Sequence, residues 1–220
     1  MDQVTRVPGS IVDDDEYLSR RKGLGSRIWS SWVNMRAATR ELIEENPQEQ
    51  RLVFFVLLSD IVFFLSASLR AAVSPIAGMP EEMPLTIGLV LIGSLFLRTA
   101  AMYAFSLLLT FAARVAGGKG SWKDTRTGVF WAALVAAPFG LLMALIAIML
   151  QVFAPDMPIV SDAWFGALLQ ILGLLPLVWF VSLGLAEAQG FASTRTAFQV
   201  LLLFAIIAIV VAGVMWLTGF

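Results

Sequence analysis

Two ionisable side chains, Asp60 and Arg98, lie deep inside long apolar stretches of the sequence. Either charge alone would cost about 2.5–3.5 kcal/mol at the centre of a bilayer. At a rise of ~1.5 Å per residue, their depths nearly match if the two segments are adjacent antiparallel helices. We therefore predict an intramembrane charge pair. Such a pair either fixes the packing and register of two helices or belongs to a gated path for protons or ions. The remaining alternative is that the two groups act separately, each in contact with water.

The chain contains no cysteine and no histidine. These two absences exclude thiolate nucleophiles, cysteine-bound metals and clusters, disulfides and the commonest neutral metal ligand. The predicted spans also hold no pair of carboxylates. We therefore predict no catalytic residues, no metal site and no cofactor, and we expect the protein not to be an enzyme.

A glycine-rich loop precedes the third predicted span and consists of Gly117, Gly118, Lys119, Gly120 and Ser121. A nucleotide-binding P-loop requires G-x-x-x-x-G-K-[ST] after a strand. Here Gly120 follows Lys119, Ala113 stands five positions before Gly118, and no strand precedes the loop, so the nucleotide interpretation fails. The loop is then either an ordinary helix-terminating turn or a basic turn that contacts lipid phosphates.

Small residues recur at every fourth position of the third predicted span: Gly128, Ala132, Ala136, Gly140 and Ala144. This spacing produces a narrow ridge of small side chains on one helix face. Helices in lipid associate through such ridges because their backbones can approach closely. We predict a packing seam, either within one bundle or between two protomers.

The composition requires a membrane, because 59% of the residues are hydrophobic and only 14% are charged, with a mean hydropathy of +0.83. A soluble 220-residue globule needs a more polar surface than this. We predict an all-α, polytopic membrane helix bundle in residues 50–220. Its five transmembrane helices are expected at about 52–72, 85–116, 128–152, 163–186 and 197–218.

Two segments precede the spans. Residues 1–25 carry charges without apolar periodicity, which predicts a disordered tail. Residues 26–47 form a predicted amphipathic helix, with Trp29 and Trp32 on its apolar face and Arg36 and Arg40 within or beside that face. This arrangement predicts an interfacial helix anchored in the lipid headgroups. The alternative is that the helix packs on a partner or on the protein's own loops.

The positive charges predict the orientation. Lys and Arg cluster before the first span and in the second loop, and the fourth loop carries Arg195, whereas the opposite side carries only Arg70. The positive-inside rule therefore places the N-terminus in the cytoplasm and the C-terminus outside.

Two motifs resemble the bacterial branch of the Yip family (Ypt/Rab-interacting proteins). The loop from Gly117 to Asp124 resembles its G-G-x-G-[ST]-aromatic motif. The end of the fourth span resembles its closing A-E-x-H-G-F segment, and the matching residues include Glu187, Gln189, Gly190 and Phe191. Gln189 stands where many relatives are expected to have His. The resemblance covers residues 50–220 and implies five spans in a bacterial inner membrane.

Eukaryotic members of the family resemble adaptors for Rab-type GTPases, partners that bacteria lack. The leading functional prediction is a non-enzymatic scaffold that organises the membrane or recruits a partner. Its expected partners are the lipid bilayer and a membrane protein or a second copy of the chain, and nucleic acid is not expected. The alternative is a small transporter or channel component that uses the Asp60/Arg98 pair.

Overall fold

The computed structural model describes residues 23–73, 84–153 and 163–218, and every regular element in these ranges is a helix. The helices are α2 (Leu24–Val33), α3 (Met35–Glu44), α4 (Glu49–Val73), α5 (Pro84–Val115), α6 (Trp122–Val152), α7 (Ala163–Ala188) and α8 (Thr194–Thr218). The prediction of an all-helical bundle is confirmed. The predicted disordered tail lies outside the described residues, except that α2 already begins at Leu24.

Within the described residues, four helices are long and apolar enough to cross a bilayer: Glu49–Leu69, Gly93–Val115, Trp122–Gln151 and Trp164–Ala188. The helix α8 extends over 25 residues, and its apolar segment Thr194–Ile207 is shorter than the other four. Large apolar side chains such as Phe96 and Leu97 are about three-quarters exposed on these helices. Their outward faces thus suit a hydrocarbon solvent, and the protein is an integral membrane protein.

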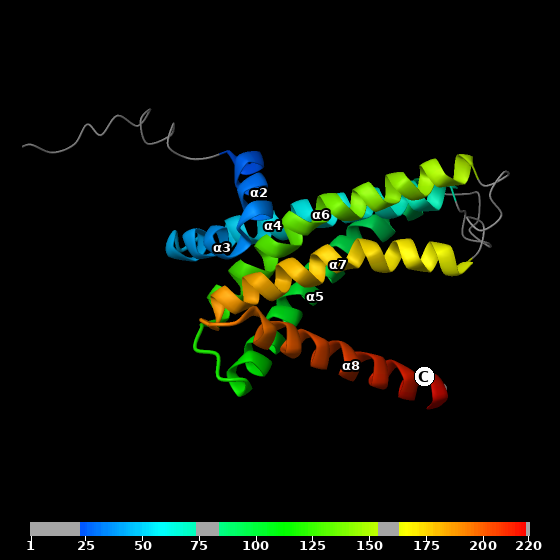
Figure 1. Ribbon diagram of the computed structural model, residues 1–220. Helices are drawn as coiled ribbons and strands as arrows, with labels where there is room; N and C mark the ends of the chain where they lie inside the picture. Colours follow the sequence, from blue (N-terminus) through cyan, green and yellow to red (C-terminus); the bar gives the residue numbers. More distant parts are fainter. Residues whose placement is uncertain (1–22, 74–83, 154–162, 219–220) are drawn as a thin grey trace, which may run out of the picture.

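The helices α4, α6 and α7 run side by side, while α5 crosses them (Figure 1). The core lies along the first part of α6, where Val129, Phe130, Trp131 and Val135 are almost completely buried. The helix α8 diverges from α7 toward the C-terminus (Figure 1). The helices α2 and α3 lie at the same end of the bundle as the α5–α6 loop and the α7–α8 connection.

The single helix predicted over 26–47 is divided into two helices at Asn34. Asn34 has non-helical backbone angles (φ −144°, ψ 80°), and its side-chain oxygen accepts a hydrogen bond from the Ala37 amide at 3.2 Å. Asn favours such N-cap positions because it can satisfy an amide that lacks a helical partner. The apolar periodicity alone did not indicate this break.

The helix α6 begins six residues before the start predicted for the third span. Ser121 caps it, and a capping box joins Ser121 to Asp124: each side chain accepts a hydrogen bond from the other residue's backbone amide. This reciprocal arrangement satisfies two amides at the start of the helix. The prediction followed hydropathy and therefore placed the start where the apolar residues begin.

Candidate functional site

The glycine loop begins as a helix terminator. Gly117, directly after the C-cap of α5, has a left-handed φ of +90°. The Gly118 amide donates to the Ala113 carbonyl at 2.8 Å, and the Gly117 amide donates to the Arg114 carbonyl at 3.0 Å. These two bonds define a Schellman motif, in which glycine is preferred because it adopts positive φ without steric cost.

The end of α7 repeats the same geometry. Gly190 has a φ of +69°, the Phe191 amide donates to the Ala186 carbonyl at 2.8 Å, and the Gly190 amide donates to the Glu187 carbonyl at 3.2 Å. The two stretches singled out in the sequence are therefore two helix ends of one kind.

These two helix ends bind each other through Gln189, which is 1% exposed. The Gln189 carbonyl accepts from the Lys119 amide at 3.0 Å, and its side-chain oxygen accepts from the Gly120 amide at 3.2 Å. Its side-chain nitrogen donates to Thr125 Oγ1 at 2.6 Å. We call this junction of residues 117–121, Thr125 and Gln189 the glycine joint.

All five backbone amides from Gly117 to Ser121 donate to acceptors within the protein. A phosphate-binding loop needs such amides free to point at its ligand. The geometry therefore favours a helix-terminating turn over the alternative of contact with lipid phosphates through the backbone.

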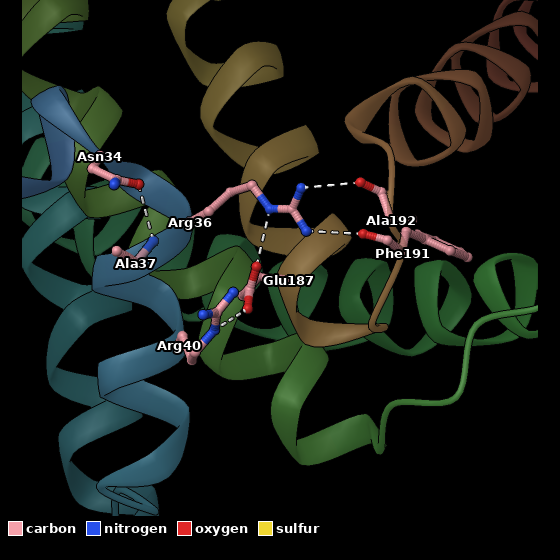
Figure 2. Close-up of polar contacts among 7 residues, drawn as sticks. All are labelled: Asn34, Arg36, Ala37, Arg40, Glu187, Phe191 and Ala192. Carbon is pink, nitrogen blue, oxygen red and sulfur yellow. Dashed lines mark hydrogen bonds and ion pairs between the residues drawn. The ribbon is translucent and has the colours of Figure 1, made fainter.

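An ionic clasp joins α3 to the end of α7. Glu187 accepts from Arg36 Nε at 3.0 Å and from Arg40 Nε at 2.5 Å (Figure 2). Arg36 also donates to the Phe191 carbonyl at 2.9 Å and to the Ala192 carbonyl at 3.4 Å. Only 10% of the Glu187 side chain is exposed. The hydrogen bond with Glu187 raises the pKa of the Arg40 guanidinium, so this cation stays charged.

The helix α2 packs on α6 rather than standing apart from the bundle. Trp131 Nε1 donates to Ser31 Oγ at 3.0 Å, and Trp32 Nε1 donates to the Val135 carbonyl at 2.9 Å. Pro138 lies in this part of α6 and lacks the amide that would bind the carbonyl four residues earlier. The Trp32 indole thus donates to a carbonyl adjacent to the one that Pro138 leaves unpaired. Trp29, in contrast, remains 66% exposed.

A second ionic cluster holds the turn between α3 and α4. Glu45 pairs with Arg27 and with Arg51, the latter at 2.7 Å. Burial alone would raise the pKa of Glu45, but the hydrogen bonds from Arg27 and Arg51 outweigh burial and hold it below its usual value. This stabilisation is therefore present above the unfolded-state pKa and is lost as the pH falls through the lowered folded-state pKa.

Asp60 on α4 and Arg98 on α5 form an ion pair through Oδ1 and Nε, and Thr99 Oγ1 donates to the other Asp60 oxygen at 3.2 Å. The Arg98 guanidinium also lies 3.8 Å from the centre of the Phe63 ring. The Asp60 side chain is fully buried, whereas that of Arg98 is 29% exposed. The structure thus brings together the two residues predicted to pair, in an asymmetric setting.

A cavity of ≈ 190 Å³ lies between α4, α5, α6 and α7 and reaches Arg98. Its polar lining comes from Arg98, Ser59, Ser66 and Gln170. Asp60 is paired with Arg98 but is not among the lining residues, and only 1% of its surface is exposed.

The predicted small-residue seam has different surroundings at the two ends of α6. Gly128 lies against Gly184 of α7 so closely that a Cβ on either would come within 2.7 Å of the other's carbonyl oxygen. Ala132 and Ala144 are fully buried and Ala136 almost so. At Gly140 a Cβ would meet no atom within 4 Å, since Gly140 lines the cavity together with Ala136. Close helix contact is therefore concentrated at the Gly128 end.

The fold and these sites define a class: a polytopic, all-helical integral membrane protein whose N-terminal helix pair is fixed to its bundle. Comparison with protein families matches residues 29–215 to the Yip1 domain, and the chain belongs to that family. The match begins inside α2 and so includes the second half of α2 and all of α3, which the resemblance in the sequence did not cover. Comparisons with curated proteins and with solved structures found no match.

We predict that Glu187→Gln loosens α2 and α3 while leaving the bundle folded. The neutral amide loses the charge that holds Arg36 and Arg40, so the charge-assisted hydrogen bonds that join α3 to the end of α7 become weaker. Hydrogen–deuterium exchange should become faster in residues 24–44 and stay unchanged in α6. Glu41→Gln is the matched control, because Glu41 is exposed on α3. Unchanged exchange in α3 of Glu187→Gln would contradict the clasp.

Proposed function

We propose that this chain is a non-enzymatic member of the bacterial branch of the Yip family that recruits or organises other components at the membrane. The observation that supports this is the α2–α3 pair, one side of which is fixed to α6 and α7. On its free side Trp29 is 66% exposed and Val33 is 80% exposed. Large apolar side chains held outward on a rigid support form a surface suited to binding.

The proposed topology has five spans, with the N-terminus in the cytoplasm and the C-terminus in the periplasm. Its support is a group of cations that contact residues at the helix ends around α3, namely Arg36, Arg51, Lys123 and Arg126. The 25 residues of α8 correspond to about 37 Å of helix, enough for a fifth crossing of a hydrocarbon core ~30 Å thick.

We expect the partner to be a membrane protein or a second copy of the chain, with the bilayer as the common support. The test is purification in mild detergent followed by mass spectrometry of wild type and of the double variant Trp29→Ser/Val33→Ser. A stoichiometric partner should be lost from the double variant. Val115→Ser is the control, because Val115 is 92% exposed but lies at the end of α5. Isolation of the wild type without any stoichiometric partner, or an unchanged partner in the double variant, would contradict the proposal.

The alternative of a small transporter or channel component draws support from the cavity that reaches Arg98. A path through the Asp60/Arg98 pair would need the cavity to continue past Asp60, which is 1% exposed. Solute or proton flux in reconstituted vesicles that depends on Asp60 would favour this alternative over the scaffold.

A further inference from the structure

The cavity beside Arg98 has a lining that differs from that of a simple packing defect between helices. It has a fixed cation at one side, three neutral polar side chains, and apolar walls that include Phe63, Leu174 and Leu177. We propose that it binds the carboxyl group of a membrane-dissolved acid with a long apolar chain, that is, a free fatty acid.

The first argument is the state of the guanidinium. Arg98 uses Nε toward Asp60, and its face lies against the Phe63 ring. Asp60 pairs with Arg98 by charge, and Arg98 Nε has no hydrogen-bonding partner among the residues that the structure describes. Because a guanidinium carries five N–H donors in a rigid fork, its terminal edge remains available on the cavity side. That edge can donate to the carbonyl oxygen of a carboxyl group, in a hydrogen bond assisted by the charge of the guanidinium.

The second argument is the size and setting of the cavity. A cavity of about 150 Å³ in another protein holds one benzene molecule, so ≈ 190 Å³ accommodates a carboxyl group and a few methylene groups. The rest of the chain must leave through the mouth. Phe63 and Leu174 both line the cavity and are 47% exposed, so they offer an apolar route from the cavity to the surrounding lipid.

The third argument is charge balance. Asp60 already neutralises Arg98, so an added carboxylate would leave one uncompensated negative charge in a low-dielectric site. Among the lining residues, α6 and α7 contribute no ionisable side chain, and α4 and α5 contribute only Arg98. The acid therefore binds with its proton: its carbonyl oxygen accepts from Arg98, and its hydroxyl donates to a neutral polar side chain of the lining, while Arg98 keeps its charge. Neutral lipids lack this carboxyl group, and headgroups much larger than a carboxyl group exceed the volume of the cavity.

The experiment uses the full chain in vesicles of phosphatidylcholine and two photoreactive probes, a diazirine fatty acid and its methyl ester. Wild type should be labelled by the acid on α6 and α7 near Gly140 and Leu174, and excess unlabelled palmitate should compete. The ester should label at least about tenfold less, since it lacks the carboxyl hydroxyl that donates to the neutral polar lining. Equal labelling by acid and ester would overturn the proposal.

Three variants locate the site. Arg98→Gln should reduce labelling by about tenfold, and Asp60→Asn should increase it, because that change removes the competing carboxylate.

Gly140→Leu should block labelling by filling the cavity, since a Cβ at Gly140 meets no atom within 4 Å. Gly166→Leu is its control, because Gly166 has equally open space but does not line the cavity. If Arg98→Gln does not fold, the Gly140→Leu result and the ester comparison decide. Acid labelling that persists in Gly140→Leu would place the probe elsewhere and overturn the proposal.

Discussion

Replacing either member of the Asp60–Arg98 pair is expected to destabilise the bundle by about 2–4 kcal/mol, and replacing both by less than the sum. Asp60→Asn leaves a guanidinium that cannot lose its proton, while Arg98→Gln leaves a carboxyl that can become neutral by binding one. Asp60→Asn should therefore lower the free energy of unfolding more than Arg98→Gln does. The difference is reduced because 29% of the Arg98 side chain is exposed.

The measurement is the free energy of unfolding in mixed detergent–SDS micelles for wild type, Asp60→Asn, Arg98→Gln and the double variant. The coupling energy should be about 1–3 kcal/mol. Arg114→Gln is the control for the loss of a cation from α5, because Arg114 is exposed near the helix end. If the loss of unfolding free energy in the double variant equals the sum of the losses in the two single variants, the two charges do not stabilise each other.

The second large effect is expected from Gly120→Ala, a change of one methyl group. A Cβ at Gly120 would overlap the carbonyl oxygen of Ala188 and crowd the Gln189 Cα. These atoms belong to backbone and cannot turn aside as a flexible side chain can, so the loop and the end of α7 must separate. Overpacking of this kind costs about 1–3 kcal/mol. Loss of the Gly120–Gln189 and Gln189–Thr125 hydrogen bonds would add to that cost.

The thermal midpoint of Gly120→Ala in detergent should fall by several degrees, and hydrogen exchange should become faster at Lys119 and Gly120. Gly166→Ala provides the comparison, because its new methyl group meets no atom within 4 Å and alanine favours the helix. A midpoint for Gly120→Ala equal to that of wild type would mean that the loop does not lie against α7 in the membrane.

The membrane class and the helical fold could be predicted from the sequence because both depend on hydropathy summed over long segments. Matched depth on neighbouring helices indicated the pairing of Asp60 with Arg98, which needs only the helix rise and an antiparallel connection. The predicted start of α6 was six residues too late, although the Ser121–Asp124 capping box was visible in the sequence. The hydropathy signal begins only after the polar first turn of that helix.

The clasp and the glycine joint could not be predicted in this way. Arg36 and Glu187 are 151 positions apart, and nothing local in either segment identifies the other. Both motifs at the joint were recognised separately, but their contact depends on how closely α6 and α7 approach. That approach is set by Gly128 and Gly184, and the sequence showed only the first of these as part of a periodic ridge. Long-range partners of this kind require the three-dimensional packing.

The glycine joint also determines which parts of the bundle can move relative to one another. Gln189 joins the end of α7 to the loop between α5 and α6 and to the first turn of α6, and it uses its carbonyl and both ends of its side-chain amide to do so. Rotation of α7 about its own axis would break all three bonds together. These three helix ends therefore behave as one rigid pivot, and changes of shape are left to the opposite end of the bundle and to the diverging α8 (Figure 1).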